Sequence, residues 1–320
     1  MHYIVKNNRK NGDKMYLYRI ETDKDKNLNN FEKLEKIIKK APLASTNSER
    51  LKQELENIKE FGTATAFLTL MKLKKQHGIK IPSFCGCLPY SYIAYILDIT
   101  KINPVKYDLC SYFSAHCPEL IHILASDKND ISNITADRIE DLSSSEYSKE
   151  VILMWKMVNN FDELTIENFE KFMRLKEKNS KETFRNKIYN SDKLNIENLC
   201  NIIAELRISR WTRNVSPQDI SNIPDNFYNI FSLTNGKLLY QEQLYEICKK
   251  LLGCDYKRFS KLALAIECQN PFTRPLLKGN DEDFLAEVIN KSQYLERKGN
   301  ILHQALLLRK ILKKQKERKS

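Results

Sequence analysis

The sequence contains few residues that favour tight turns, with only 8 glycines and 9 prolines among 320 residues. Sandwiches and barrels of many short strands need such residues for their hairpins, so this shortage argues against those folds. Apolar runs long enough to cross a membrane are absent, and the opening stretch MHYIVKNNRK lacks the apolar core of a secretory signal. We therefore expect a mostly helical protein in the cytoplasm.

The overall composition is that of a folded protein, with 42% hydrophobic and 29% charged residues. A chain of this length can form two domains, each with its own core. The net charge of +12 makes the surface attractive to polyanions. Nucleic acid is the first candidate partner and an anionic membrane is the second.

The 8 cysteines should stay reduced in the cytoplasm. Cys85 and Cys87, or Cys110 and Cys117 with His116 beside it, offer soft ligands for zinc. The alternative is that these thiols are small apolar side chains in a core. Because neither pair has the two-residue spacing of a zinc knuckle, we predict no metal site here.

Hydrophobic spacing predicts several helices. Thr46 to Glu49 has the spacing of a capping box, and Leu51, Leu55 and Ile58 follow on one helical face. Further helices are predicted at residues 151–176, 195–206, 240–252 and 283–313. The polar stretch 126–150 is rich in Ser and Asp, which is typical of a linker or a trimmed insertion.

Residues 50–109 carry a first recognisable block. Two helical patterns lead to the loop PSFCGC at 82–87, then to an apolar helix with Ser91, Ala94 and Tyr95, and then to ITKINPVKYDL at 99–109. This order resembles the palm of C-family replicative polymerases, that is, of the bacterial DNA polymerase III α subunit. In that family the loop and helix read GPGRGSAAGSLVAY, and the closing segment reads ITxIDPLxYxL.

A second block resembles the fingers of the same family. Residues 193–210, KLNIENLCNIIAELRISR, are similar to KPxxxEDLIAxxALYRPGP, and residues 235–266 are similar to the segment that contains VYQEQV. The most specific string consists of Tyr240, Gln241, Glu242 and Gln243. A shorter segment, KGNILH at 298–303, resembles the family's FNKSHA.

This resemblance implies an α+β fold that is predominantly α-helical. We expect a reduced polymerase palm with a small mixed sheet, followed by a helical fingers domain. The predicted divisions are an N-terminal appendage at 1–44, a palm-like domain at 45–175, a fingers-like domain at 176–300 and a basic C-terminal helix or tail at 301–320.

The family's chemistry needs carboxylates that hold two divalent metal ions. It takes them from a PDxD pair and from a later aspartate in a DFLGLxTL segment. Counting on from Pro118 and Glu119, the pair falls on Ala125 and Asp127, while one insertion would place it on Asp127 and Asn129, with Asp130 beside it. Asp162 preserves the spacing of the third aspartate. The alternative for Asp127 and Asp162 is an ordinary surface carboxylate.

The phosphate-binding groups of the family are also replaced. The arginine of its loop corresponds to Cys85 and the serine to Cys87, so Gly86 alone of GPGRGS is kept. The cationic RRAMGKK of the fingers aligns with ALAIECQ at 263–269, which has no cation. Because each such group contributes strongly to catalysis, we predict an inactive enzyme without a cofactor, with Mg²⁺ relevant only if polymerase activity persists.

The leading hypothesis is a pseudo-polymerase that binds template-primer DNA or other replication proteins. Candidate phosphate contacts near the fingers block are Arg207, Arg210, Arg213, Lys249, Lys250, Lys257 and Arg258. These cations could equally form an ordinary solvated helix surface, and the basic run from Arg309 to Lys319 could be a phosphate-binding arm or a frayed end. Two other hypotheses are a minimal active polymerase that uses Asp127 and Asp162, and a module that docks on replication proteins without nucleic acid.

Overall fold

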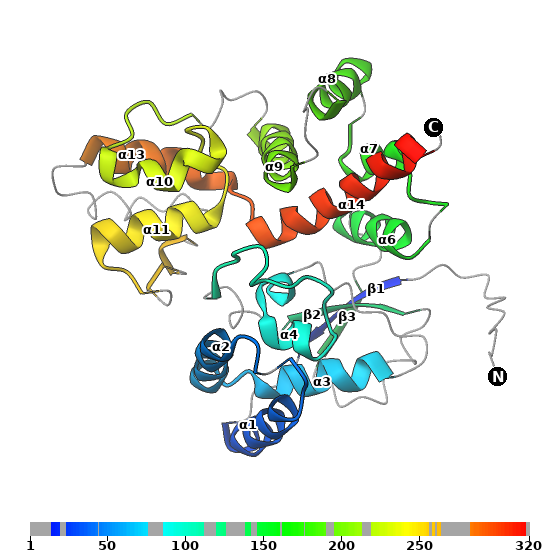
Figure 1. Ribbon diagram of the computed structural model, residues 1–320, viewed down its shortest axis with the longest axis vertical. Coiled ribbons are helices and arrows are strands. Elements are labelled where there is room, and N and C mark those ends of the chain that lie inside the picture. Colours follow the sequence, from blue (N-terminus) through cyan, green and yellow to red (C-terminus); the bar gives the residue numbers. More distant parts are fainter. Residues whose placement is uncertain are drawn as a thin grey trace. The chain divides into compact units, whose positions relative to one another are not determined.

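The computed structural model describes most of the chain in two compact units, Met1–Asn168 and Phe169–Ser320. The described residues are 14–19, 24–43, 45–75, 86–111, 120–125, 138–141, 146–160, 162–175, 177–189, 195–212, 219–255, 258–259, 261–263 and 282–317. Helices predominate among them, as predicted (Figure 1). The division after Asn168 differs from the predicted boundary after residue 175.

A small sheet lies in the N-terminal unit. Its strands are β1 (Lys14–Arg19), β2 (Leu120–Ala125) and β3 (Arg138–Asp141), in the order β2-β1-β3. Lys14 lies opposite Ala125, at one end of the pairing between β1 and β2. Both described pairings are antiparallel, whereas the sequence predicted a mixed sheet.

Residues 1–44 are part of the N-terminal unit, and their described part does not form the separate appendage that was predicted. β1 is the central strand of the sheet, and helix α1 (Lys24–Lys39) inserts Leu34 and Ile38, both 0% exposed, into the core. Likewise, β3 lies inside the stretch 126–150 that was predicted as a linker or insertion. β3 is short and pairs with a distant partner, so local sequence gives it little signal.

The helical core of this unit packs beside the sheet. Its remaining helices are α2 (Ser48–Phe61), α3 (Ala64–Lys75), the 3₁₀ turn η1 (Leu88–Tyr90), α4 (Tyr92–Ile96), α6 (Glu146–Asn159) and α7 (Ile166–Phe172), the last of which crosses the division between the units. α1 packs against α2 and α3, α2 packs against α4, and α6 contacts β1. Phe67, Leu70 and Leu73 repeat at helical spacing on α3 and are fully buried.

α2 begins without the predicted capping box. Its N-cap is Asn47, whose side chain makes no capping hydrogen bond and instead donates to the Tyr92 hydroxyl at 3.1 Å. The helix ends at Gly62, whose φ of 67° is in the left-handed region that glycine adopts without strain. A tertiary contact with α4 thus replaces the local cap.

The C-terminal unit is built around α9 and α14. Its elements are α8 (Lys178–Tyr189), α9 (Ile196–Thr212), η3 (Asp225–Phe227), α10 (Tyr228–Phe231), η4 (Ser232–Thr234), α11 (Gln241–Leu252), α13 (Glu282–Lys291), η6 (Ser292–Tyr294) and α14 (Lys298–Glu317). α14 packs on α9 and buries Ile301, Ala305 and Leu308. Of the two alternatives for residues 301–320, a helix or a tail, the structure has a helix as far as Glu317, and one side of it is buried. Within the described residues, no helix is both long and apolar enough to cross a membrane.

Two long predicted helices are each interrupted. The predicted helix 151–176 is divided into α6 and α7, with a turn in which the N–H of Asp162 donates to Asn160 Oδ1 at 3.1 Å. The predicted helix 283–313 is divided into α13 and α14, because the backbone of Glu296 forms a bridge with Tyr240 and therefore leaves the helical conformation. The helices predicted at 195–206 and 240–252 are confirmed as α9 and α11.

Candidate functional site

A fully buried carboxylate, Glu54, joins α2 to the start of α4. Its Oε1 accepts from Arg50 Nε at 2.7 Å and from the backbone N–H of Tyr92 at 2.9 Å. Its Oε2 accepts from Ser91 Oγ at 3.1 Å and from the N–H of Ile93 at 3.0 Å. Burial raises the pKa of Glu54, whereas the Arg50 charge and the two N–H groups lower it. The carboxylate is thus satisfied on both oxygens.

Arg50 extends this network to two backbone segments of the first block. Its Nη1 donates to the carbonyl of Leu109 and its Nη2 to the carbonyl of Tyr90, each at 2.7 Å. Because the planar guanidinium points its donors in fixed directions, one side chain sets the positions of both backbone segments. The loop at 86–91 and the segment that ends at Leu109 are therefore held against α2.

Of the loop that the sequence matched to a phosphate-binding loop, Gly86 and Cys87 are described, and the residues that follow them are packed into the core. Gly86 has a φ of 62°, but the four residues after it, from Cys87 to Tyr90, are all buried, and Tyr90 is 0% exposed. The next N–H groups are already bonded: Tyr92 and Ile93 donate to Glu54. A phosphate cradle needs several N–H groups directed at the ligand. These two N–H groups are instead directed at an internal carboxylate.

Of the carboxylates predicted for metal binding, Asp162 alone lies within the described residues. Ala125 is the last residue of β2, and Asp127 lies outside the described residues, as do Asn129 and Asp130. Asp162 is exposed in the turn before α7 and lies on no strand. Its role as a remnant of the third aspartate stays a prediction.

An acidic residue that sequence reasoning missed, Asp141, is the last residue of β3. Within the three described strands, the only acidic residues are Glu140 and Asp141. Asp141 is paired with Tyr16 on β1, and Tyr16 is paired on its other side with Ile123, two positions before Ala125. The strand sequence RIED was overlooked because it is short and follows a polar stretch.

The described residues contain no cluster of three His, Cys, Asp or Glu side chains that could hold a metal ion. Of the proposed thiols, Cys87 is buried and Cys110 is half-buried. Cys85, His116 and Cys117 lie outside the described residues. Zinc binding by these pairs is therefore untested.

The string Tyr240 to Gln243 forms the centre of a hydrogen-bond network in the C-terminal unit. The side chain of Gln243 is buried, and its oxygen accepts from the backbone N–H groups of Leu239 at 2.8 Å and Tyr240 at 3.0 Å. Its nitrogen donates to the carbonyls of Ile230 at 3.1 Å and Lys237 at 3.0 Å. One amide thus joins the start of α11 to α10 and to the loop between them.

The other three residues of the string are also engaged within the unit. Tyr240 donates from its hydroxyl to Asn201 Oδ1 on α9 at 2.9 Å. The Gln241 side chain accepts from Arg297 Nε at 3.1 Å, and Glu242 accepts from the N–H of Lys298 at 3.0 Å, at the start of α14. The string therefore connects α9, α11 and α14 and has a structural role.

The predicted phosphate contacts near this string differ in their surroundings. Arg207 forms an ion pair with Glu296 at 2.7 Å, and its side chain is only 16% exposed. Lys250 donates to the carbonyl of Asn226 at 3.0 Å. Lys249 and Arg258 are exposed. Arg213 and Lys257 lie outside the described residues, as does the side chain of Arg210.

A row of lysines on α14 was not among the predicted contacts. Lys310, Lys313 and Lys316 are exposed and follow one another at intervals of three residues, while Leu312 and Ile311 between them are buried. Within the described residues, none of the three takes part in an ion pair. The sequence signal was the basic run from Arg309 to Lys319, for which a frayed end had been the alternative.

Comparison with known proteins supports the first block. Residues 26–117 match the family described as the bacterial DNA polymerase III alpha NTPase domain. The DNA polymerase III subunit alpha of Thermotoga maritima is 42% identical over 79 residues, which are 23% of this chain and 9% of that relative. The chain contains a DNA polymerase III α-like segment. It therefore spans only a small part of the length of the curated relative that it matches.

The segment that matches the polymerase family, residues 26–117, contains the whole Glu54 network and the buried residues that follow Gly86. It ends before β2 and before the second block. The resemblance of residues 193–266 to polymerase fingers thus stays a prediction. What the structure adds is that both blocks contain a buried polar network.

Glu54→Gln is expected to lower the free energy of unfolding by about 3–5 kcal/mol, because an amide nitrogen then faces hydrogen-bond donors and the Arg50 charge loses its partner. Urea unfolding followed by circular dichroism measures the change. Glu56→Gln, on the exposed face of the same helix, is the control and should stay within about 0.5 kcal/mol. Equal effects of the two substitutions would contradict the central role of Glu54.

Gln243→Glu is expected to destabilise the protein by about 2–4 kcal/mol, because a carboxylate cannot donate to the carbonyls of Ile230 and Lys237. Gln241→Glu is the matched control. It keeps the oxygen that accepts from Arg297 and should change the stability by less than about 1 kcal/mol. Thermal unfolding of both variants tests the difference, and a Gln241→Glu variant that is the less stable of the two would refute it.

Proposed function

We propose that this DNA polymerase III α-like protein is catalytically inactive and binds nucleic acid. The observation that carries the first part is the burial of Cys87 to Tyr90, at the end of the segment matched to the phosphate-binding loop and directly after it. The N–H groups of Tyr92 and Ile93 donate to Glu54. A triphosphate that used these two N–H groups would have to displace an internal carboxylate that has four donors.

The strand end supports the same proposal. Ala125 is the last residue of β2, and in one of the two registers it takes the position of the first carboxylate of the family's pair; in the other register Asn129 takes the position of the second. Alanine has no side-chain oxygen with which to hold a metal ion, and asparagine has no negative charge. The loss of one charge-stabilising group commonly lowers a rate by about 10²–10³-fold. When the carboxylate and the phosphate grip are both lost, these factors leave no useful rate of polymerisation.

A minimal active polymerase is the second candidate, because Asp141 lies on the strand next to β1 and near the level of Ala125. With Asp127 and Asp162 it would supply three carboxylates.

The proposal of inactivity predicts that no primer is extended in the presence of Mg²⁺ or Mn²⁺. A denaturing gel of a labelled primer-template provides the measurement, with an active polymerase added to a parallel reaction as its control. A template-dependent product that Asp141→Ala or Asp127→Ala abolishes would overturn the proposal.

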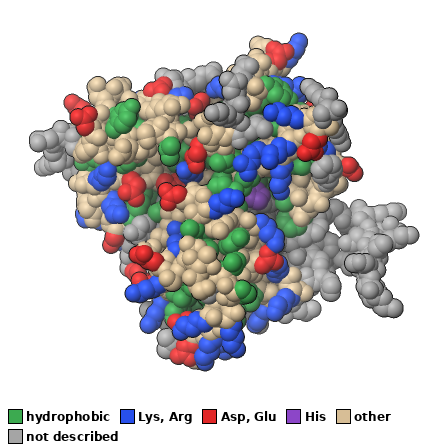
Figure 2. Space-filling model, in the orientation of Figure 1, with side chains coloured by type: hydrophobic (Ala, Val, Ile, Leu, Met, Phe, Trp, Pro, Cys, Tyr) green, Lys and Arg blue, Asp and Glu red, His purple; other side chains and the backbone are tan. Residues whose placement is uncertain are grey.

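Nucleic-acid binding is supported by the net charge of +12 and by the exposed lysines of α14. Figure 2 shows basic side chains widely distributed over the viewed face. Phosphate contacts release counterions, so affinity should fall steeply as salt rises. The likeness to a replication polymerase makes DNA and the replication machinery candidate partners of this chain.

The variant Lys310→Glu, Lys313→Glu, Lys316→Glu is expected to bind a labelled primer-template more weakly. Its plot of log affinity against log salt should be shallower by about 3 units, since each lysine contributes about 0.9. Fluorescence anisotropy over a series of salt concentrations measures both quantities.

The control for this variant changes the same charge at three other exposed lysines, Lys52, Lys101 and Lys178, each of which is already in an ion pair. It should keep most of the affinity. No binding at low salt, a flat salt response, or equal losses in the two variants would refute nucleic-acid binding by α14.

A further inference from the structure

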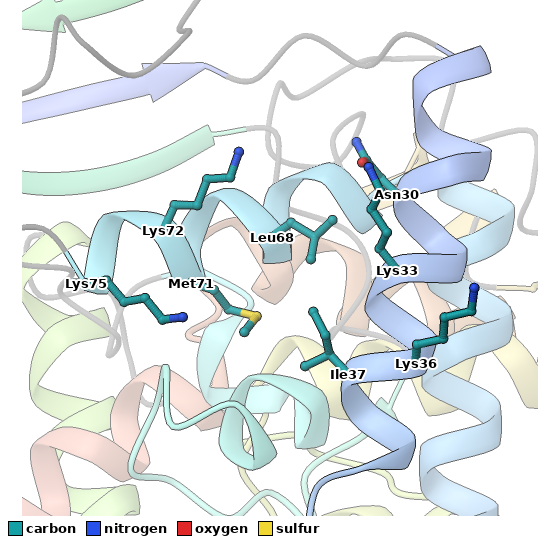
Figure 3. A pocket seen from close by; sticks show the side chains of 8 residues that line it. All are labelled: Asn30, Lys33, Lys36, Ile37, Leu68, Met71, Lys72 and Lys75. Atoms are coloured by element: carbon teal, nitrogen blue, oxygen red, sulfur yellow. The ribbon is translucent and has the colours of Figure 1, made fainter.

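A groove lies between α1 and α3 in the N-terminal unit, with a volume of about 490 Å³. Its floor consists of Ile37 from α1 and of Leu68 and Met71 from α3 (Figure 3). Ile37 is 36% exposed, whereas the other two side chains are half-buried. Ligand pockets in proteins have volumes of roughly 300–1,000 Å³, so this groove can accept two or three side chains of a partner.

The rim of the groove is basic. Lys33 and Lys36 extend from α1, and Lys72 and Lys75 extend from α3, with the apolar floor between the two pairs (Figure 3). All four are exposed, and none of them forms an ion pair within the described part of the chain. The lining contains no acidic side chain. The lysines therefore face solvent as an uncompensated charge around an apolar surface.

The geometry of the two helices is fixed, so the groove is a preformed feature. Asn30 Nδ2 donates to Thr65 Oγ1 at 3.0 Å across the two helices, at one end of the groove. Leu34 and Ile38 on α1 and Leu70 and Leu73 on α3 are fully buried on the opposite faces. A partner thus loses little free energy to rearrangement of the protein on binding.

We propose that this groove binds an acidic segment of a partner protein, which places two or three aliphatic side chains on the floor and carboxylates against the four lysines. Charge complementarity favours an anionic partner. Single-stranded nucleic acid is the less favoured anion, because its bases stack on aromatic side chains and none lines the groove. Leucine and methionine provide an adaptable surface for aliphatic side chains.

The test uses the whole chain and a fluorescent peptide. The peptide has Leu or Met at every third or fourth position, so that they form one face of a helix, and Glu at positions between them. We expect saturable binding by fluorescence anisotropy. The variant Lys36→Glu, Lys72→Glu should weaken it by at least about tenfold. Met71→Ser should also weaken it and leave its salt dependence unchanged, because this substitution removes apolar contact and no charge. If Met71→Ser unfolds the protein, Ile37→Ser replaces it, at a more exposed position. This variant should likewise bind the peptide more weakly with an unchanged salt dependence.

The matched control carries Lys52→Glu and Lys178→Glu, which change the net charge equally and lie elsewhere; its affinity should change by less than about twofold. A second peptide with Ser in place of every Leu and Met should bind at least about tenfold more weakly.

Equal binding of the two peptides would overturn the proposal and indicate a general anion surface. Stronger competition by oligo-dT or by phosphatidylserine vesicles would overturn it in favour of nucleic acid or lipid. The α14 variant should bind the peptide normally, which separates this site from nucleic-acid binding.

Discussion

The ion pair between Glu54 and Arg50 organises the N-terminal unit. The carboxylate accepts from the N–H groups at the start of α4, and the guanidinium donates to two carbonyls in segments distant in the chain. A buried charge is costly unless all its hydrogen-bonding positions are satisfied. This requirement fixes α2, the loop after Gly86 and the segment that ends at Leu109 as one arrangement.

The same network accounts for the burial of the segment from Cys87 to Ile93, which follows the loop matched to the phosphate grip. Residues that satisfy buried polar groups are needed for folding, whatever the protein does. The residues from Cys87 to Tyr90 are buried beside this network, and the Tyr90 carbonyl accepts from Arg50. Gln243 has the same role in the C-terminal unit that Glu54 has in the N-terminal unit. Its buried side chain forms hydrogen bonds with several backbone segments and so holds them together.

Local patterns predicted some elements well and others badly, for identifiable reasons. α9 and α11 were predicted because apolar residues recur at helical spacing along each of them. The break between α13 and α14 was not predicted, because it depends on the pairing of Glu296 with Tyr240, which is distant in sequence. The strand β3 was missed for the same reason, and the basic run near the C-terminus was ambiguous until α14 was seen to bury Leu308 and Ile311.

The sequence by itself determined that the chain is mainly helical, basic and similar over one segment to a polymerase subunit, because composition and short motifs are local properties. Only the tertiary structure decided which polar and charged side chains bond to other parts of the protein. It showed that Tyr240 to Gln243 is a structural string, that Arg207 is paired with Glu296, and that α1 and α3 enclose an apolar floor with a basic rim. Each of these depends on contacts between residues far apart in the chain, which no local pattern encodes.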